Sequence, residues 1–184
     1  MIYIVRHGQT DWNVEGRYQG RKDIELNKTG IKQAEEMKEK LKGIKFDQVF
    51  SSPLKRAYKT AQIITDCPIT LDNRIIERCN GELEGKLKSE TVNMVDFTDD
   101  NEKRMGIETL PDFRKRINCF FDYIDQNYRG KNILVVTHAG VSIYARCYFE
   151  GEPKDGNYNN YKLKNCGILM YDNSLKKEKD SFER

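Results

Sequence analysis

Histidine is scarce in this chain, and the features of a membrane or secreted protein are absent. Only two histidines occur among the 184 residues, and no apolar run approaches the roughly 20 residues that cross a bilayer. The chain opens on a strand-like segment, whereas a signal peptide would be basic and then apolar. We therefore expect a cytoplasmic protein with no membrane partner.

The cysteines form no recognisable pattern. They are five in number, widely spaced and free of any Cys-x-x-Cys pair, which argues against a disulfide framework and against a zinc ribbon. We expect reduced, mostly structural thiols, and two histidines with scattered cysteines fall short of the usual three-ligand zinc site unless carboxylates contribute. The sequence thus predicts no metal and no cofactor.

An excess of charge of one sign is also lacking. The chain has 32 Lys and Arg against 29 Asp and Glu, a net charge of +3, and most of its lysines alternate with acids. Proteins that bind nucleic acids usually carry a strongly basic face. We therefore expect a solvated surface and no nucleic-acid partner.

The two histidines stand at corresponding places. His7 follows the apolar run at 2–5 and His138 follows the one at 133–136, each with a glycine close behind. A buried strand that ends in a polar residue and a glycine delivers side chains to the carboxyl edge of an α/β sheet, where such folds bind ligands. Parallel pairing of the two strands would bring both imidazoles into one crevice.

Strand and helix patterns alternate along the rest of the chain. Apolar residues at helical spacing predict a helix over 29–44, a short strand follows at 46–50, and Ser52-Pro53 is interpreted as the cap and first-turn proline of a second helix. The later elements are a helix opened by Leu110-Pro111 and stopped by Gly130, a helix over 141–149 and a strand over 167–171. This alternation predicts an α/β fold with a mostly parallel central sheet and helices on both faces.

The chain length fits one domain, residues 1–184, able to bury a sizeable core. The stretch from about 86 to 109 breaks the rhythm: it is polar and has no clear period. We expect it to be a small insertion over the carboxyl edge of the sheet that covers a site.

Four ordered blocks of sequence carry a resemblance. They are Arg6-His7-Gly8-Gln9-Thr10-Asp11-Trp12-Asn13 with Gln19-Gly20 beyond it, Leu26-Asn27-Lys28-Thr29-Gly30, Ser51-Ser52-Pro53-Leu54-Lys55-Arg56-Ala57, and Thr137-His138-Ala139-Gly140. At this spacing, over nearly the whole chain, they closely resemble the histidine phosphatase superfamily, which includes the cofactor-dependent phosphoglycerate mutases. The resemblance implies a phosphoglycerate mutase-like fold and a metal-independent phosphatase of small phosphorylated metabolites, as a monomer or homodimer.

The chemistry of phosphoryl transfer suits these residue types. A neutral imidazole is a good nucleophile and a good leaving group, and His7 is assigned that role, with formation of a phosphohistidine. Arg6 and Arg56 match phosphoryl oxygens bidentately, and His138 would face the same oxygens. Further candidates for contact with the phosphate or the substrate are Gly8, Asn13, Gln19, Gly20 and Ala139.

A carboxylic acid must protonate the leaving alkoxide. The family places it in a segment that Ile76-Glu77-Arg78-Cys79-Asn80-Gly81 matches, so the resemblance assigns Glu77; from spacing alone Glu82 or Glu84 would serve equally. The segment Leu87-Lys88-Ser89 is unusual for the family, so the resemblance does not assign the residues that border the substrate.

Other functions remain alternatives. A phosphoglycerate mutase would share every catalytic residue, a protein phosphohistidine phosphatase resembles a shorter core, and a non-catalytic phosphate-binding module would keep the pocket without turnover. A serine hydrolase is not expected, because no Gly-x-Ser-x-Gly surrounds Ser51 or Ser52 and capping explains Ser52.

Overall fold

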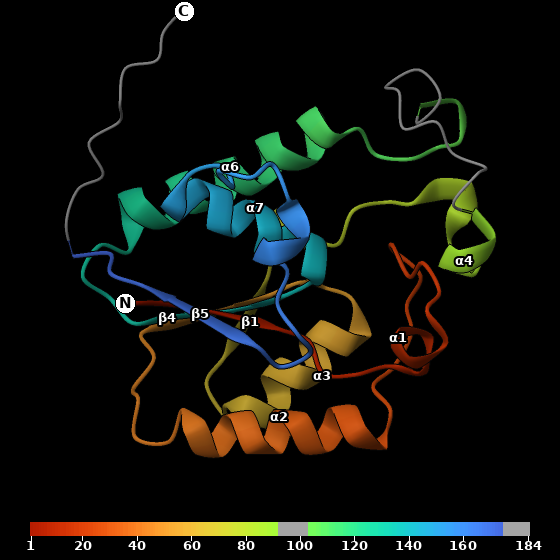
Figure 1. The fold of residues 1–184 in the computed structure, drawn as a ribbon. Coiled ribbons are helices and arrows are strands. Elements are labelled where there is room, and N and C mark those ends of the chain that lie inside the picture. Colours follow the sequence, from red (N-terminus) through yellow and green to blue (C-terminus); the bar gives the residue numbers. More distant parts are fainter. Residues whose placement is uncertain (92–102, 175–184) are drawn as a thin grey trace, which may run out of the picture.

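A five-stranded sheet lies between two helical layers in the computed structural model (Figure 1), which describes residues 1–91 and 103–174. The strands are β1 (Ile2–Arg6), β2 (Gln48–Ser51), β3 (Ile69–Leu71), β4 (Ile133–Thr137) and β5 (Ile168–Tyr171). The helices are α1 (Asp11–Glu15), α2 (Lys28–Lys40), α3 (Lys55–Ile64), α4 (Lys88–Thr91), α6 (Leu110–Asn127) and α7 (Ala139–Glu150), with short 3-10 turns η1 (Asn73–Ile75), η2 (Gly81–Leu83) and η3 (Tyr158–Tyr161). No helix in these ranges is both long and apolar enough to cross a membrane.

The strand order is β3-β2-β4-β1-β5, and only β5 runs antiparallel to its neighbour. This confirms the predicted mostly parallel sheet. β1 and β4 pair in register, with Arg6 opposite Thr137, so the residue after each strand, His7 or His138, leaves the sheet at the same edge. The sequence-distant histidines are therefore neighbours in space.

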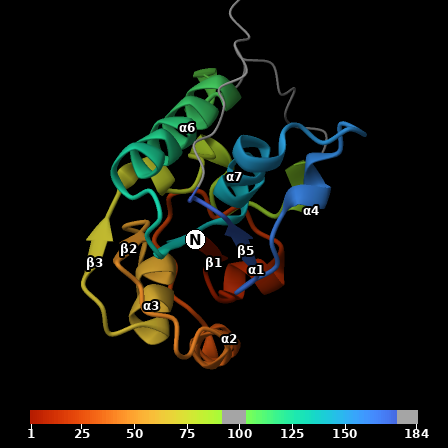
Figure 2. The same cartoon turned by 90° about the vertical axis from the view of Figure 1, so that its left-hand side faces the viewer.

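Each central strand is buried on both faces, and its side chains alternate between two cores. Ile2 and Ile4 of β1 pack in the cluster under α6 and α7, whereas Tyr3 and Val5 pack in the cluster that α2 and α3 cover. Figure 2 shows the two helical layers on opposite sides of the strands. The predicted cover of helices on both faces is thus confirmed.

The helices form where caps and apolar stripes coincide. Thr109 caps α6 by accepting the Asp112 N–H at 3.3 Å, and Pro111 lies in the first turn. The buried stripe of α6 is Phe113, Ile117, Phe120, Phe121 and Ile124. This helix begins at the predicted Leu110-Pro111 and ends at Asn127, shortly before Gly130.

Two boundaries differ from prediction. α2 ends at Lys40 instead of residue 44, because the chain turns at once through Gly43, whose φ of +85° is left-handed. α3 begins at Lys55, with Leu54 as its N-cap and no side-chain cap bond, so Ser52 is not its cap and Pro53 is not in its first turn. The strand β3 was not expected, since it has only three residues at a sheet edge.

The region proposed as an insertion falls partly outside the described residues. Its described parts, 86–91 and 103–109, lie at the carboxyl end of the sheet, where α4 stands beside α1 (Figure 1). Single β-bridges join Arg17 to Leu87 and Asn80 to Ile107, and Leu83 packs on Ile107 in a small separate core. These segments therefore form walls beyond the end of β1.

Candidate active site

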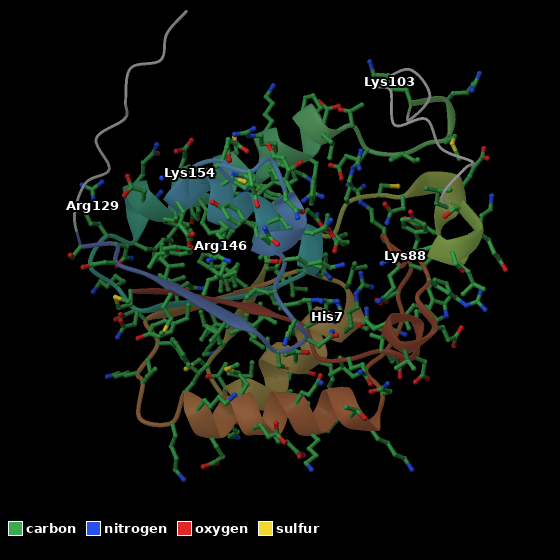
Figure 3. The ribbon with its side chains drawn as sticks, in the orientation of Figure 1. His7, Lys88, Lys103, Arg129, Arg146 and Lys154 are labelled. Carbon is green, nitrogen blue, oxygen red and sulfur yellow. The ribbon has the colours of Figure 1, made fainter. Side chains whose placement is uncertain are left out.

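His7 and His138 lie side by side in the interior. Their ring centroids are 5.2 Å apart, the planes are tilted by 58°, and the side chains are 2% and 0% exposed. Figure 3 places His7 at the end of β1, between the helical layers, with Lys88 on its α4 side. The β1–β4 register, predicted from the two apolar runs, produces this pair.

The neutral tautomer of His7 is fixed by a backbone group. Its Nδ1 lies 2.7 Å from the carbonyl oxygen of Gly8, and a carbonyl can only accept, so Nδ1 carries the hydrogen. Burial lowers the pKa of His7 well below its usual value, and the positive charges of Arg56 and Arg6 lower it further. The imidazole is therefore neutral near pH 7, with an unprotonated Nε2 available as a nucleophile.

His138 is held by Ser52. The Nε2 of His138 lies 2.6 Å from Ser52 Oγ, which also accepts the Leu54 N–H at 3.4 Å. Burial first, and then the positive charge of Arg56, lower the pKa of His138 well below its usual value. We infer that the Ser52 hydroxyl donates to Nε2, which leaves the proton of the neutral ring on Nδ1. That Nδ1 is buried and has no partner among the described residues.

Two buried arginines bring positive charge to the same place. Arg56 of α3 is 0% exposed and donates to the carbonyl oxygens of Lys22 and Gly20, both at 2.8 Å, while Arg6 donates to that of Leu163 at 2.8 Å. Burial lowers the pKa of Arg56 to about 10, so it stays charged near neutrality. The Nε atoms of Arg6 and Arg56 are buried without a partner in the described chain.

Glu77 reaches the site after η1 and meets the start of α7. Its Oε2 accepts the Gly140 N–H at 3.2 Å, and its Oε1 accepts the Arg78 N–H at 2.9 Å. A side chain at residue 140 would displace this carboxylate, because a Cβ there would lie 2.5 Å from Glu77 Oε1. The amino end of α7, with its partial positive charge, thus holds a carboxylate.

These residues border a pocket of about 280 Å³. Arg6, His7, Arg56 and Glu77 line it, as do the predicted contact residues Asn13, Gln19, Gly20 and Ala139. His138 is not part of the lining, although its ring lies beside that of His7. Within the described residues Glu77 is the one carboxylate of the lining; Glu82 and Glu84 do not reach it, and Glu84 instead accepts the backbone N–H groups of Arg21 and Asn80.

Gly8 does not have the expected place. It is absent from the pocket lining, and its N–H donates to Thr60 Oγ1 at 3.0 Å. The absence of a side chain serves packing instead, because a Cβ would lie 2.4 Å from the carbonyl oxygen of Gly30. Gly20, in turn, contributes through its carbonyl bond to Arg56.

Sequence reasoning missed several residues of the site. Ser52 was interpreted as a cap, although the serine directly after a strand at the carboxyl edge was a usable signal. Lys88 and Lys162 line the pocket mouth, from α4 and from the segment before β5. Partial burial lowers the pKa of both ammonium groups. The charge of Lys162 further lowers the pKa of Lys88, and the charge of Arg6 further lowers the pKa of Lys162. Among the described residues neither lysine has a carboxylate partner.

Comparison with known proteins gives consistent matches. Residues 2–177 match the model of the histidine phosphatase superfamily (branch 1). The chain is 38% identical over 148 residues to the uncharacterized phosphatase PhoE of Bacillus subtilis, covering 78% of this chain and 74% of that protein. It is 35% identical over 160 residues to a metal-independent phosphoserine phosphatase of Arabidopsis thaliana, covering 79% and 67%.

Solved structures agree. A mutant phosphoserine phosphatase from Entamoeba histolytica, in complex with phosphoserine, superposes with a TM-score of 0.78 at 30% identity, covering 91% of this chain and 87% of that one. The similarity thus extends over both the strands and the loops that carry the site.

Proposed function

The chain belongs to the histidine phosphatase superfamily and is a hydrolase of phosphomonoesters, and from this premise we propose the residues that perform the reaction and the kind of substrate. One observation carries the proposal: Nε of Arg6, Nε of Arg56 and Nδ1 of His138 are buried without a partner among the described residues, and all three are N–H donors with the His138 tautomer inferred above. The His138 ring lies 5.2 Å from that of His7, and the charges of both arginines act on His7. A buried unsatisfied donor costs about 1–3 kcal/mol, so it persists where a ligand supplies the acceptor. Phosphoryl oxygens are such acceptors.

In the first half-reaction Nε2 of His7 attacks the phosphorus atom. The N–P bond forms as the ester P–O bond breaks, and Glu77, protonated at that stage, gives its proton to the leaving alkoxide oxygen. The two guanidinium groups and the His138 Nδ1–H neutralise the charge on the equatorial oxygens. The products are the free alcohol and a phosphohistidine at residue 7.

Water completes the second half-reaction. Glu77, now a carboxylate, takes a proton from the water that attacks phosphorus, and the N–P bond breaks. Orthophosphate leaves, His7 is again neutral, and Glu77 is again protonated. The same residue thus acts as acid and then as base, and none of these steps needs a metal ion.

The pocket mouth points to a substrate with a second anionic group. Lys88 and Lys162 place two ammonium groups there, and the charge of Lys162 lowers the pKa of Lys88. Glu77 is the carboxylate whose charge acts on both, and within the described residues neither lysine forms an ion pair with it or with another acid. A carboxylate near the phosphate would offset both charges. We therefore propose a small phosphomonoester that also carries a carboxylate, as phosphoserine does; a phosphoserine phosphatase is among the similar structures.

A matched pair of substrates tests this proposal. Phosphoserine and phosphoethanolamine differ only by the carboxylate. We expect Lys88→Met and Lys162→Met each to lower kcat/KM for phosphoserine about tenfold, the size of one charge-assisted hydrogen bond, and to leave phosphoethanolamine nearly unchanged. Equal losses on both substrates would refute the carboxylate site.

The reaction class has its own assay. Purified protein should release orthophosphate from p-nitrophenyl phosphate in the presence of a chelator, and His7→Ala should abolish the release. With 3-phosphoglycerate it should release orthophosphate whether or not bisphosphoglycerate is present. Isomerisation without release would identify a mutase, and phosphate binding without turnover would identify a non-catalytic module.

A further inference from the structure

The segment Leu163–Gly167, which leads into β5, is fastened to the end of β1. The backbone N–H of Cys166 donates to the carbonyl oxygens of Arg6 at 3.0 Å and His7 at 3.3 Å, and the Arg6 N–H donates to Gly167 at 3.1 Å. Cys166 itself has a φ of +49°, a left-handed conformation that a non-glycine residue adopts only where its surroundings fix it. None of the motifs that identified the site includes this segment.

The side chain of Asn165 points from this segment toward the loop that follows β1 and begins with His7. Its Nδ2 lies 3.1 Å from the carbonyl oxygen of His7 and 3.1 Å from Oδ1 of Asn13. The carbonyl oxygen of His7 can only accept, so the amide atom that faces it must be the nitrogen. The orientation of the Asn165 amide is therefore decided by a backbone group.

The orientation of the Asn13 amide is fixed in the same way. The backbone N–H of Thr10 donates to Asn13 Oδ1 at 3.2 Å, and a backbone N–H can only donate, so this atom is the oxygen. Asn165 supplies the second donor to the same oxygen. Both hydrogens of Asn13 Nδ2 then lack an acceptor among the described residues, although Asn13 lines the pocket.

We propose that Asn165 is a positioning residue, which fixes the amide of Asn13 so that its NH2 group donates to the phosphoryl group. The inference rests on the proposed function, since the acceptor is the phosphate that His7 attacks. Asn165 touches no substrate; it acts through Asn13 and through the carbonyl of His7. Without Asn165, Thr10 alone holds the Asn13 oxygen, and the amide is free to rotate away.

A double-mutant cycle between Asn13 and Asn165 tests the proposal. We expect Asn13→Ala to weaken binding of orthophosphate, measured by calorimetry, about tenfold, and Asn165→Ala to weaken it several-fold. In the Asn13→Ala background the Asn165→Ala change should weaken binding less than twofold, because its route through Asn13 is gone and only its bond to the His7 carbonyl remains. Equal effects of Asn165→Ala in both backgrounds would overturn the proposal.

Controls separate positioning from a general loss of structure. If Asn165→Ala fails to fold, Asn165→Leu replaces it in the cycle. Leucine is similar in shape to asparagine but cannot donate a hydrogen bond, so we expect the same several-fold loss of phosphate binding. Asn173→Ala removes an asparagine whose side chain makes three hydrogen bonds, to Met1, Tyr128 and Lys131, at the other end of β1, and should lower Tm without changing phosphate affinity. If the protein hydrolyses phosphomonoesters but the Asn13 and Asn165 substitutions act independently on phosphate binding, only the Asn165 proposal fails. If the wild type hydrolyses no phosphomonoester, the proposed function fails.

Discussion

The chemistry of each histidine is set by one neighbour. The carbonyl of Gly8 directs the free lone pair of His7 to Nε2, and a hydrogen bond donated by the Ser52 hydroxyl, as inferred above, directs the hydrogen of His138 to Nδ1. In the proposed mechanism two identical side chains thereby have opposite roles, one as a nucleophile and the other as a hydrogen-bond donor. Burial beside two arginines keeps both neutral.

Loss of Ser52 should remove the preference of His138 for a single tautomer. We expect Ser52→Ala to lower kcat about tenfold, comparable to the loss of one donor to a charged group, and nitrogen NMR should show a mixture of His138 tautomers. Ser51→Ala is the matched control, because Ser51 is equally buried but its hydroxyl, among the described residues, bonds only the Ser52 carbonyl. A Ser52→Ala enzyme with full kcat and one tautomer would contradict the role of this hydroxyl.

The lowered histidine pKa values predict how stability depends on pH. In the unfolded chain a histidine takes up a proton below about pH 6.5, whereas in the folded protein both rings stay neutral. Protons then favour the unfolded state, so the free energy of unfolding should fall as pH drops below about 6.5, by up to about 1.4 kcal/mol per pH unit for each histidine. Denaturant titrations from pH 7.5 to 5 measure this slope.

Replacement of a histidine supplies the control for that slope. His138→Gln removes one titrating group, so its curve should be shallower by about the contribution of one histidine. An identical slope in the variant would mean that carboxylates, not His138, govern stability in this range.

At the scale of elements, the start of α7 holds Glu77 in place. Gly140→Ala would put a methyl group 2.5 Å from Glu77 Oε1 and 3.1 Å from Phe113 Cζ. We expect the displacement of Glu77 to lower the rate of hydrolysis of alkyl phosphates about a hundredfold. The rate with p-nitrophenyl phosphate should fall much less, since p-nitrophenolate leaves without protonation. Initial rates on the two substrates give the ratio, and equal losses would argue for a general distortion of the pocket.

The elements also show what sequence can and cannot predict. The apolar runs at 2–5 and 133–136, and the capped stripe of α6, were sufficient for the sheet and its cover, because burial on both faces leaves a strong local pattern. β3 has no such pattern, because its three residues at the sheet edge are mostly exposed. Ser52 looked like a cap because its contact, His138, is distant in sequence.

The same distinction holds within the site. His7, His138, Arg6, Arg56 and Glu77 were found through motifs, and the structure brings them together. The packing role of Gly8 was not predicted, since a Cβ there would clash with Gly30 in another segment. Lys88, Lys162 and Asn165 acquire meaning only from the tertiary arrangement.

For the whole molecule, local charge matters more than net charge. The chain carries only +3 overall, but within the described residues the pocket lining has six cationic side chains and one carboxylate. The cations are Arg6, Arg17, Arg56, Arg78, Lys88 and Lys162. Such a field attracts phosphorylated substrates from solution.

Salt should therefore slow capture of the substrate. Raising NaCl from about 50 to about 500 mM shortens the screening length from roughly 14 to roughly 4 Å, and kcat/KM for phosphoserine should fall several-fold while kcat changes little. Sodium sulfate is unsuitable, because sulfate competes for the site. If kcat/KM stays constant across this range, the pocket charges play no part in capture.

Covalent capture of phosphate by His7 can be observed directly. Wild-type protein is mixed with radioactively labelled phosphomonoester, denatured in alkali during steady turnover, and digested for mass spectrometry. Label should appear on the peptide that contains His7, survive alkali, disappear in acid as phosphohistidine does, and be absent from His7→Ala. Steady hydrolysis with no label on residue 7, or with label on another side chain, would contradict the mechanism.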